Sequence, residues 1–87
     1  MIWEIEYTKR ASKDAKKVSA ANLKNKVQKM LEALAEDPYR KPPPFEKLVG
    51  DLGGCFSRRI NIQHRLVYEL IEQKRMIKVH SMFLHYE

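Results

Sequence analysis

Hydrophobic and polar positions follow two different periods in the first 36 residues of the chain. Residues 1–7 alternate, with large apolar side chains at every second position, which is the pattern of a half-buried β-strand. Between residues 8 and 36 the apolar side chains recur at helical spacing, in two stripes that are out of phase. We therefore expect two helices, over roughly 8–19 and 21–36, with Thr8 as the N-cap of the first.

Prolines and glycines separate this helical region from the rest of the chain. Pro38 and the run Pro42-Pro43-Pro44 end the second helix, and three consecutive prolines form a stiff, extended loop that leads into residues 45–48. Three strand-like runs follow, over residues 55–60, 64–70 and 76–83.

This order of elements predicts an α+β fold. The last three strands would form an antiparallel meander covered by the helices, and the first strand would join the same sheet to bury its edge. We expect two N-terminal helices packed on a four-stranded, mainly antiparallel sheet. Residues 1–87 should form a single domain, because a second core would need roughly another hundred residues.

The amino-acid composition indicates which kinds of molecule the protein could bind. Hydrophobic residues make up 44% of the chain, which is typical of a globular domain. Seventeen Lys and Arg against eleven Asp and Glu give a net charge of +6. The excess favours a polyanionic partner, namely RNA, DNA or an acidic protein, although many small proteins are basic for solubility alone.

The same composition argues against membranes, export and zinc. No run of 18 apolar residues exists for a transmembrane helix, and the N-terminus lacks the pattern of a signal peptide. Cys55 is the single cysteine and no Cys/His cluster has zinc spacing, so we expect a cytoplasmic protein with no metal and no cofactor.

Polar side chains gather on or beside the predicted sheet. They are Glu46, Arg58, Arg59, His64, Arg65, His80, His85 and Tyr86. Arg59 and Arg65 flank a turn, so they can lie side by side on neighbouring strands. Arg65 shares its strand face with Val67, and an arginine on a partly apolar face needs an anion opposite it.

One carboxylate, two arginines, a histidine and a tyrosine suit RNA cleavage without a metal. A carboxylate can take the proton of the ribose 2′-OH as this oxygen attacks the adjacent phosphorus. Arginines stabilise the additional negative charge of the transition state. His or Tyr can give a proton to the departing 5′-oxygen.

Each residue also has a plainer interpretation. Glu46 alone is more often a surface ion-pair partner, and Arg58 and Arg59 are equally well ordinary charges on a sheet surface. His85 and Tyr86 can be a frayed end of the chain. Cys55 reads as a small buried residue. The residues by themselves therefore leave two functions open, a nuclease and a binding module without catalysis.

The C-terminal half also resembles a known family. The segments Ser57-Arg58-Arg59-Ile60, His64-Arg65-Leu66-Val67-Tyr68 and His85-Tyr86 resemble the Txe/YoeB group of RelE-family bacterial toxins. The loop with Glu46-Lys47-Leu48 resembles the loop that carries a glutamate in this family. The match is compact over residues 41–70, and the helices match in layout only.

The resemblance implies a fold like that of microbial ribonucleases and a toxin that cuts mRNA in the A site of the 30S ribosomal subunit. It implies that Glu46 is the general base, Arg65 the transition-state arginine and Arg59 a phosphate contact. His85 would be the general acid, with Tyr86 beside it. The products would be a 2′,3′-cyclic phosphate and a 5′-hydroxyl.

The resemblance also implies partners. A cognate antitoxin would cover the site, operator DNA would be bound only through the antitoxin complex, and a homodimer is plausible. We add Arg58 and Lys47 as candidate RNA contacts. Val49 stands where the family often has a lysine, and Glu87 follows the tyrosine at which many members end. The alternative function is a basic RNA-binding module, or a degenerate toxin that acts as an antitoxin-bound corepressor.

Overall fold

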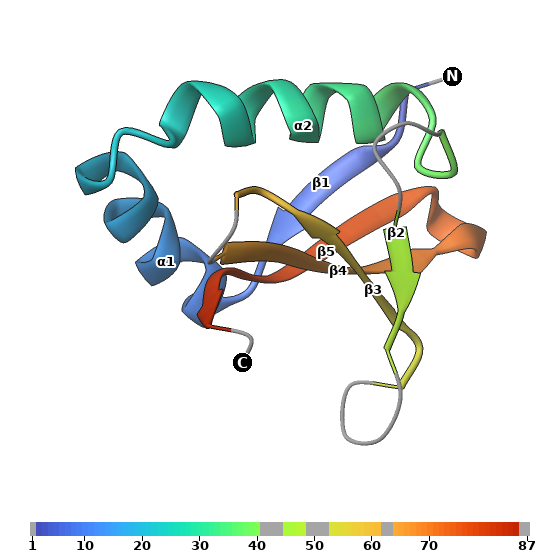
Figure 1. Cartoon of the computed structure of the whole chain (residues 1–87). Coiled ribbons are helices and arrows are strands. Elements are labelled where there is room, and N and C mark those ends of the chain that lie inside the picture. Colours follow the sequence, from blue (N-terminus) through green and yellow to red (C-terminus); the bar gives the residue numbers. More distant parts are fainter. Residues whose placement is uncertain (1, 41–44, 49–52, 62–63, 86–87) are drawn as a thin grey trace.

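Two helices pack against one side of a five-stranded sheet in the computed structural model of the chain. The structure describes residues 2–40, 45–48, 53–61 and 64–85, with the side chains of 83–85 outside this description. The strands are β1 (Glu4–Tyr7), β2 (Phe45–Lys47), β3 (Cys55–Arg59), β4 (His64–Ile71) and β5 (Met76–His85). The helices are α1 (Lys9–Ala20) and α2 (Lys24–Glu36), and a short 3₁₀ helix at Glu72–Lys74 joins β4 to β5 (Figure 1).

The helix boundaries follow from local chemistry. The Thr8 hydroxyl accepts a hydrogen bond from the Ala11 amide at 3.1 Å, which confirms the expected N-cap of α1. Asn22 adopts a positive φ of 60° in the turn between the helices, a conformation that asparagine tolerates better than most residues. Asp37 and Pro38 end α2, because proline disfavours a helical conformation in the residue before it.

The sheet has one strand more than the sequence predicts. Its order is β1-β5-β4-β3-β2, with β1 parallel to β5 and every other pair antiparallel. The additional strand is β2, in a segment where the sequence predicts a loop. Three residues are too few to show a period, and β2 exists because it pairs with β3.

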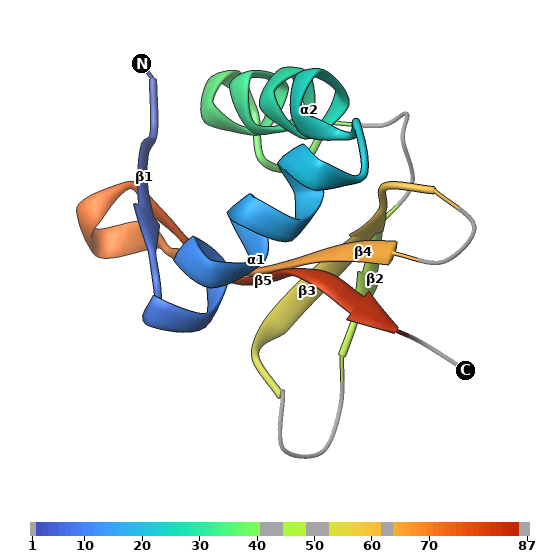
Figure 2. The same cartoon turned by 90° about the vertical axis from the view of Figure 1, so that its left-hand side faces the viewer.

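The core lies between the helices and one face of the sheet. Its buried side chains include Val27, Leu31 and Leu34 from α2, and Leu66 and Tyr68 from β4. Figure 2 shows both helices on this side of the sheet.

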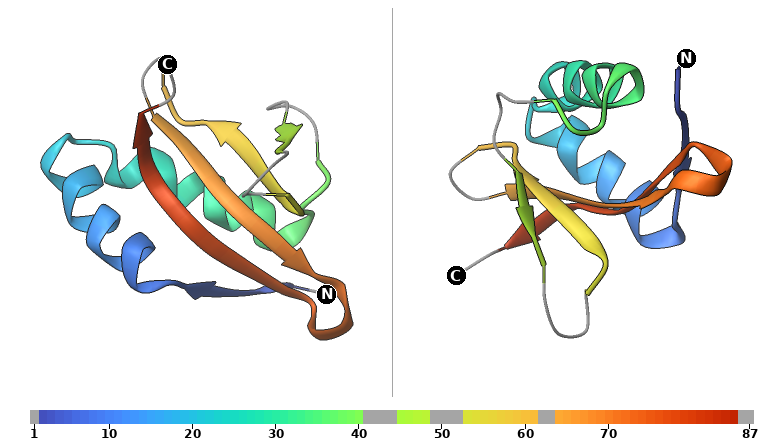
Figure 3. Two further views of the ribbon diagram at one scale, coloured as in Figure 1. Left: turned by 90° about the horizontal axis from the view of Figure 1, so that it is seen from below. Right: turned by 90° about the vertical axis from the view of Figure 1, so that its right-hand side faces the viewer.

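β4 and β5 form a long twisted pair at the centre of the molecule, and β1 runs along the outer side of β5 (Figure 3). Because β4 and β5 are antiparallel, the end of β5 lies beside the start of β4, where His85 pairs with His64. Neither α1 nor α2, nor any other helix within the described residues, is long and apolar enough to cross a membrane.

Candidate functional site

The face of the sheet that is turned away from the helices carries three of the predicted site residues. Adjacent residues of a strand point to opposite faces, and directly paired residues share a face. Leu66 and Tyr68 pack into the helix-side core, so Arg65 belongs to the opposite face. Arg59 pairs with Arg65 and therefore shares its face. Ser57 is two residues from Arg59 on β3 and lies on the same face, and Glu46 of β2 joins it because it pairs with Ser57. We call this the distal face, defined by Glu46, Ser57, Arg59, Arg65 and Val67.

Glu46 and Arg65 are in contact across the distal face. Arg65 Nη1 lies 3.4 Å from Glu46 Oε2, although the two residues are 19 positions apart in the sequence. The Glu46 side chain is 70% exposed, whereas that of Arg65 is 18% exposed. A long ion pair with one exposed partner contributes about 1 kcal/mol or less to stability. The contact therefore leaves the Glu46 carboxylate available to a ligand from solvent.

Arg59 and Arg65 occupy directly paired positions on β3 and β4, as the sequence predicted. Arg59 is exposed, and Arg65 is half-buried beside Glu46. Two guanidinium groups on neighbouring strands repel each other unless an anion lies between them. Their fork-shaped donors match the oxygens of a phosphate group. This end of the distal face is thus suited to bind a phosphodiester.

Arg58 has a different environment from the one expected of an RNA contact. It points to the helix side and is 3% exposed. Its Nε donates to Tyr68 Oη at 2.8 Å, its Nη2 donates to the Pro38 carbonyl at 3.0 Å, and its guanidinium carbon lies 4.9 Å from the centre of the Phe45 ring. The alternation along β3 buries this arginine, so we remove Arg58 from the candidate RNA contacts.

The same buried network perturbs a tyrosine. Burial raises the pKa of the Tyr68 hydroxyl, and the hydrogen bond from Arg58 opposes this rise. Tyr68 is fully buried, as the sequence predicts, and it stacks on Phe56 with ring centres 6.0 Å apart. Arg58 and Tyr68 therefore tie β2, β3 and β4 to the loop after α2 and position Glu46 indirectly.

The other predicted residues lie away from the Glu46–Arg65 contact or are only partly described by the structure. Lys47 is exposed in β2, but it is adjacent to Glu46 and belongs to the opposite face of the strand. The backbone of His85 pairs with His64 at the start of β4, next to Arg65. The side chain of His85 and the whole of Tyr86, Val49 and Glu87 lie outside the described residues. His64 is buried, and its amide donates to Asn61 Oδ1 at 2.7 Å.

Ser57 is a polar residue of this face for which the sequence predicts no role. It pairs with Glu46 on one side and Val67 on the other. Its hydroxyl is buried and has no hydrogen-bond partner within the described part of the chain. The signal that could have identified it is its alternation with Arg59, which puts both on one face.

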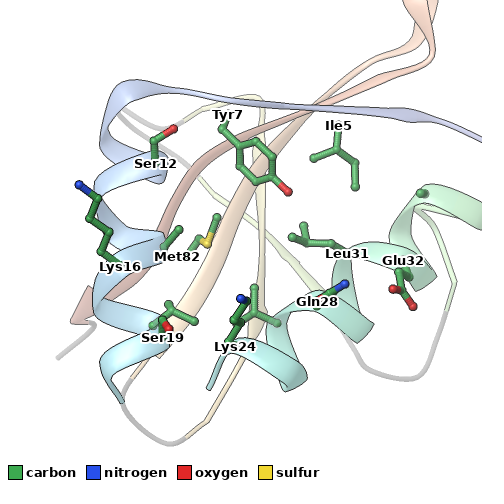
Figure 4. Close-up of a pocket in the computed structure, with 14 residues that line it drawn as sticks. Ile5, Tyr7, Ser12, Lys16, Ser19, Lys24, Gln28, Leu31, Glu32 and Met82 are labelled. Atoms are coloured by element: carbon green, nitrogen blue, oxygen red, sulfur yellow. The ribbon is translucent and has the colours of Figure 1, made fainter. Parts of the chain in front are cut away.

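A cavity of about 670 Å³ lies on the other side of the sheet, between α1, α2 and β1. Figure 4 shows Ile5 and Tyr7 along one side of it, Leu31 and Gln28 on α2, and Met82 behind. None of the distal-face residues lines this cavity. It is therefore a separate feature from the Glu46–Arg65 site.

Comparison with known proteins identifies the family. Residues 6–86 match the family described as the YoeB-like toxin of the bacterial type II toxin-antitoxin system. The chain belongs to this family. A Toxin YoeB from Synechocystis sp. is 35% identical to it over 65 residues, which are 75% of this chain and 73% of that protein.

Solved structures of YoeB toxins share the fold. The YoeB of a YoeB–YefM complex from Staphylococcus aureus is 30% identical, with a TM-score of 0.81 over 99% of this chain and 100% of that one. A YoeB dimer from the same organism is 29% identical, with a TM-score of 0.82 over the same shares of both chains. This likeness confirms the α+β fold and the toxin family that the C-terminal motifs indicate.

Proposed function

We propose that this toxin is an endoribonuclease that cleaves mRNA on the ribosome by attack of a ribose 2′-OH. The observation that carries the proposal is the exposed carboxylate of Glu46, in contact with Arg65 and beside Arg59 on one face of the sheet. A base and two phosphate-binding cations are the groups that this reaction requires within one site.

In this mechanism Glu46 takes the proton of the 2′-OH. Arg65 then changes partner, from the carboxylate in the free protein to the phosphate oxygens as the nucleophile attacks. The long 3.4 Å contact makes this exchange inexpensive, because a weak exposed ion pair is lost. Charge that develops on the phosphate is thus met by a guanidinium that is already half-buried and positioned by β4.

Arg59 binds the phosphate from the neighbouring strand, and Lys47 contributes positive charge at the β2 edge. His85 gives a proton to the departing 5′-oxygen, and Tyr86 stacks on or orients a nucleotide. The pairing of His85 with His64 supports this role, because it brings the backbone of His85 next to Arg65. The products are a 2′,3′-cyclic phosphate and a 5′-hydroxyl, and protein groups make every proton transfer, so no metal takes part.

We further propose that the partners are mRNA in the A site of the 30S subunit and a cognate antitoxin. The S. aureus YoeB occurs in a complex with YefM and as a dimer, which supports antitoxin binding and self-association for this chain. Operator DNA would be bound only through the antitoxin complex. An enzyme that acts on translating ribosomes works in the cytoplasm.

The test is cell-free translation followed by primer extension of the mRNA. We compare the wild-type protein with Glu46→Gln, Arg65→Ala and His85→Ala, and use Glu6→Gln as the matched control. Glu6 is an exposed carboxylate on β1, at the opposite edge of the sheet from β2. We expect cuts at ribosome-occupied codons for the wild type and the control, and a loss of about 100-fold or more in each site variant.

Intact mRNA with translation still blocked by the wild-type protein would contradict cleavage and support the non-catalytic binding module. A site variant that cuts as fast as the wild type would exclude the role proposed for that residue. Mapping the 3′ ends for a cyclic phosphate tests the 2′-OH mechanism separately from cleavage itself.

A further inference from the structure

Three adjacent strands bring a thiol, a carboxylate and an imidazole together at the other end of the distal side of the sheet. Cys55 of β3 pairs directly with Glu69 of β4. His80 of β5 has its Nε2 3.0 Å from Glu69 Oε1. The sulfur, one carboxylate oxygen and one imidazole nitrogen all lie within 4.8 Å of one another. Among the residues that the structure describes, these three form the one group of His, Cys, Asp or Glu side chains close enough together to hold a metal ion.

The cluster is separate from the proposed RNA site. Cys55 and Arg59 are the two ends of β3. Four residues of strand correspond to about 13 Å, at a rise of about 3.3 Å per residue. An ion at Cys55 is therefore too far from the Arg59–Arg65 pair to touch the same phosphate group.

A β-bulge aims His80 at the cluster. Val67 pairs with Ser81 and the next residue, Tyr68, pairs with Val79, so His80 is the additional residue on β5. Bulges of this kind redirect a side chain. The backbone of His80 is also fixed from the helix side, because the Thr8 hydroxyl donates to its carbonyl at 3.1 Å. Two independent features of the fold thus fix the backbone of His80, and the contact with Glu69 orients its imidazole.

We propose that Cys55, Glu69 and His80 bind one Zn²⁺ ion, with water as the fourth ligand. Thiolate, imidazole and carboxylate are the three ligand types that zinc uses in proteins. Nitrogen, oxygen and sulfur ligand atoms on one tetrahedral zinc ion are about 3.3 to 3.6 Å apart. The 3.0 Å contact between His80 and Glu69 would therefore open slightly, and the sulfur would approach both groups by about 1.3 Å at most. The ligand set carries two negative charges when it is bound, which the divalent cation neutralises.

Burial of the three side chains suits a bound ion. Cys55 is 6% exposed and forms the base of the site. The Glu69 and His80 side chains are 41% and 30% exposed, which leaves a path from solvent. Burial and then the nearby Glu69 carboxylate raise the pKa of the Cys55 thiol, so the thiol is protonated without metal and binding releases that proton.

A bound ion would join the three central strands of the sheet. Arg59 and Arg65 would stay open, since they lie at the far end of β3 and β4. Glu46 would stay open as well, because it lies on β2, a strand that supplies no ligand to the ion. The ion therefore stabilises the folded state without entering the cleavage reaction. Ligands that bind only the folded protein raise its melting temperature.

The test uses tag-free protein, because a histidine tag binds the same metals. Zn²⁺ is titrated in competition with a chromophoric chelator, and Co²⁺ is used as a spectroscopic probe. We expect one ion per chain, a thiolate-to-cobalt absorption band in the near ultraviolet, and a rise in the melting temperature with Zn²⁺. Cys55→Ser, Glu69→Gln and His80→Gln should each weaken binding at least tenfold, and the control Glu6→Gln should bind as the wild type does.

Absence of the cobalt band in the wild-type protein, or equal Zn²⁺ affinity in the wild type and His80→Gln, would overturn the proposal. Circular dichroism and urea unfolding without metal establish that each variant is folded. If Cys55→Ser does not fold, Glu69→Gln and His80→Gln decide, because both positions are partly exposed. RNA cleavage is not a readout here, so a failure of the proposed nuclease function leaves this test unaffected.

Discussion

Neighbouring arginines of β3 illustrate how residue chemistry depends on strand parity. Arg58 and Arg59 are adjacent and chemically identical, and the sequence predicts an RNA contact for both. The fold buries Arg58 against Tyr68 and the Pro38 carbonyl, and leaves Arg59 exposed opposite Arg65. A single step along a strand therefore separates a residue that supports the site from one that can bind a ligand.

Stability measurements can separate these two roles. We expect Arg58→Ala to lower the free energy of unfolding by about 2 to 4 kcal/mol, because it leaves a buried hydroxyl and a buried carbonyl without their donor. Arg59→Ala, the matched control, should change it by about 0.5 kcal/mol or less. Urea unfolding measures both. Equal destabilisation by the two variants would contradict the structural role of Arg58.

At the scale of elements, one side chain links the start of α1 to the middle of β5. The Thr8 hydroxyl accepts from Ala11 in the first turn of α1 and donates to the carbonyl of His80 in β5. The sequence predicts the first of these bonds from the N-cap pattern. It contains no signal for the second, which joins residues 72 positions apart.

Replacement of Thr8 tests this link. We expect Thr8→Ala to lower the free energy of unfolding by about 1 to 2 kcal/mol, through loss of the cap and of the bond to β5. Thr8→Ser keeps the hydroxyl and should retain most of that stability. Thermal or urea unfolding of both variants gives the difference. An alanine variant as stable as the serine variant would show that neither bond contributes.

The β2 strand is the element that the sequence did not predict. Phe45 packs edge-on against Phe56 with ring centres 5.5 Å apart, and β2 pairs with β3 in register. Both interactions are with residues about ten positions away in the chain, so no local pattern announces them. Their consequence is functional, since pairing of β2 holds Glu46 over Arg65.

At the scale of the whole molecule, the two faces of the sheet differ in what covers them. The helices and the core cover one face, whereas the other presents Arg59 and Arg65 at one end and the Cys55–Glu69–His80 cluster at the other. The net charge of +6 adds a long-range attraction for polyanions. In the proposed function, this charge attracts RNA to the molecule and the distal face positions a phosphate.

This division predicts a salt dependence. We expect the affinity for single-stranded RNA to fall roughly tenfold between 50 and 200 mM salt, as for two to three phosphate contacts. Arg59→Gln should weaken binding and reduce the slope of log affinity against log salt by about 0.7. Fluorescence anisotropy with a labelled RNA measures this. Lys29→Gln, which removes an exposed charge on α2, should leave the slope nearly unchanged, and an equal loss in both variants would indicate non-specific binding.

The sequence by itself determined the features that depend on local period and on contiguous motifs. The alternation of residues 1–7, the two helical stripes, the Thr8 cap and the motifs around Arg59 and Arg65 were sufficient for the fold class, four of the five strands and the toxin family. Each of these signals lies within a short window, where backbone geometry fixes which side chains share a face.

Only the tertiary structure decided the rest. The burial of Arg58, the existence of β2, the contact of Glu46 with Arg65 and the meeting of Cys55, Glu69 and His80 all depend on strand pairing. Pairing joins residues that are distant in the chain, and a one-residue change of register or a single bulge changes the face or the neighbours of a side chain. That information is stored in the packing of the sheet against its helices and in no single segment of the sequence.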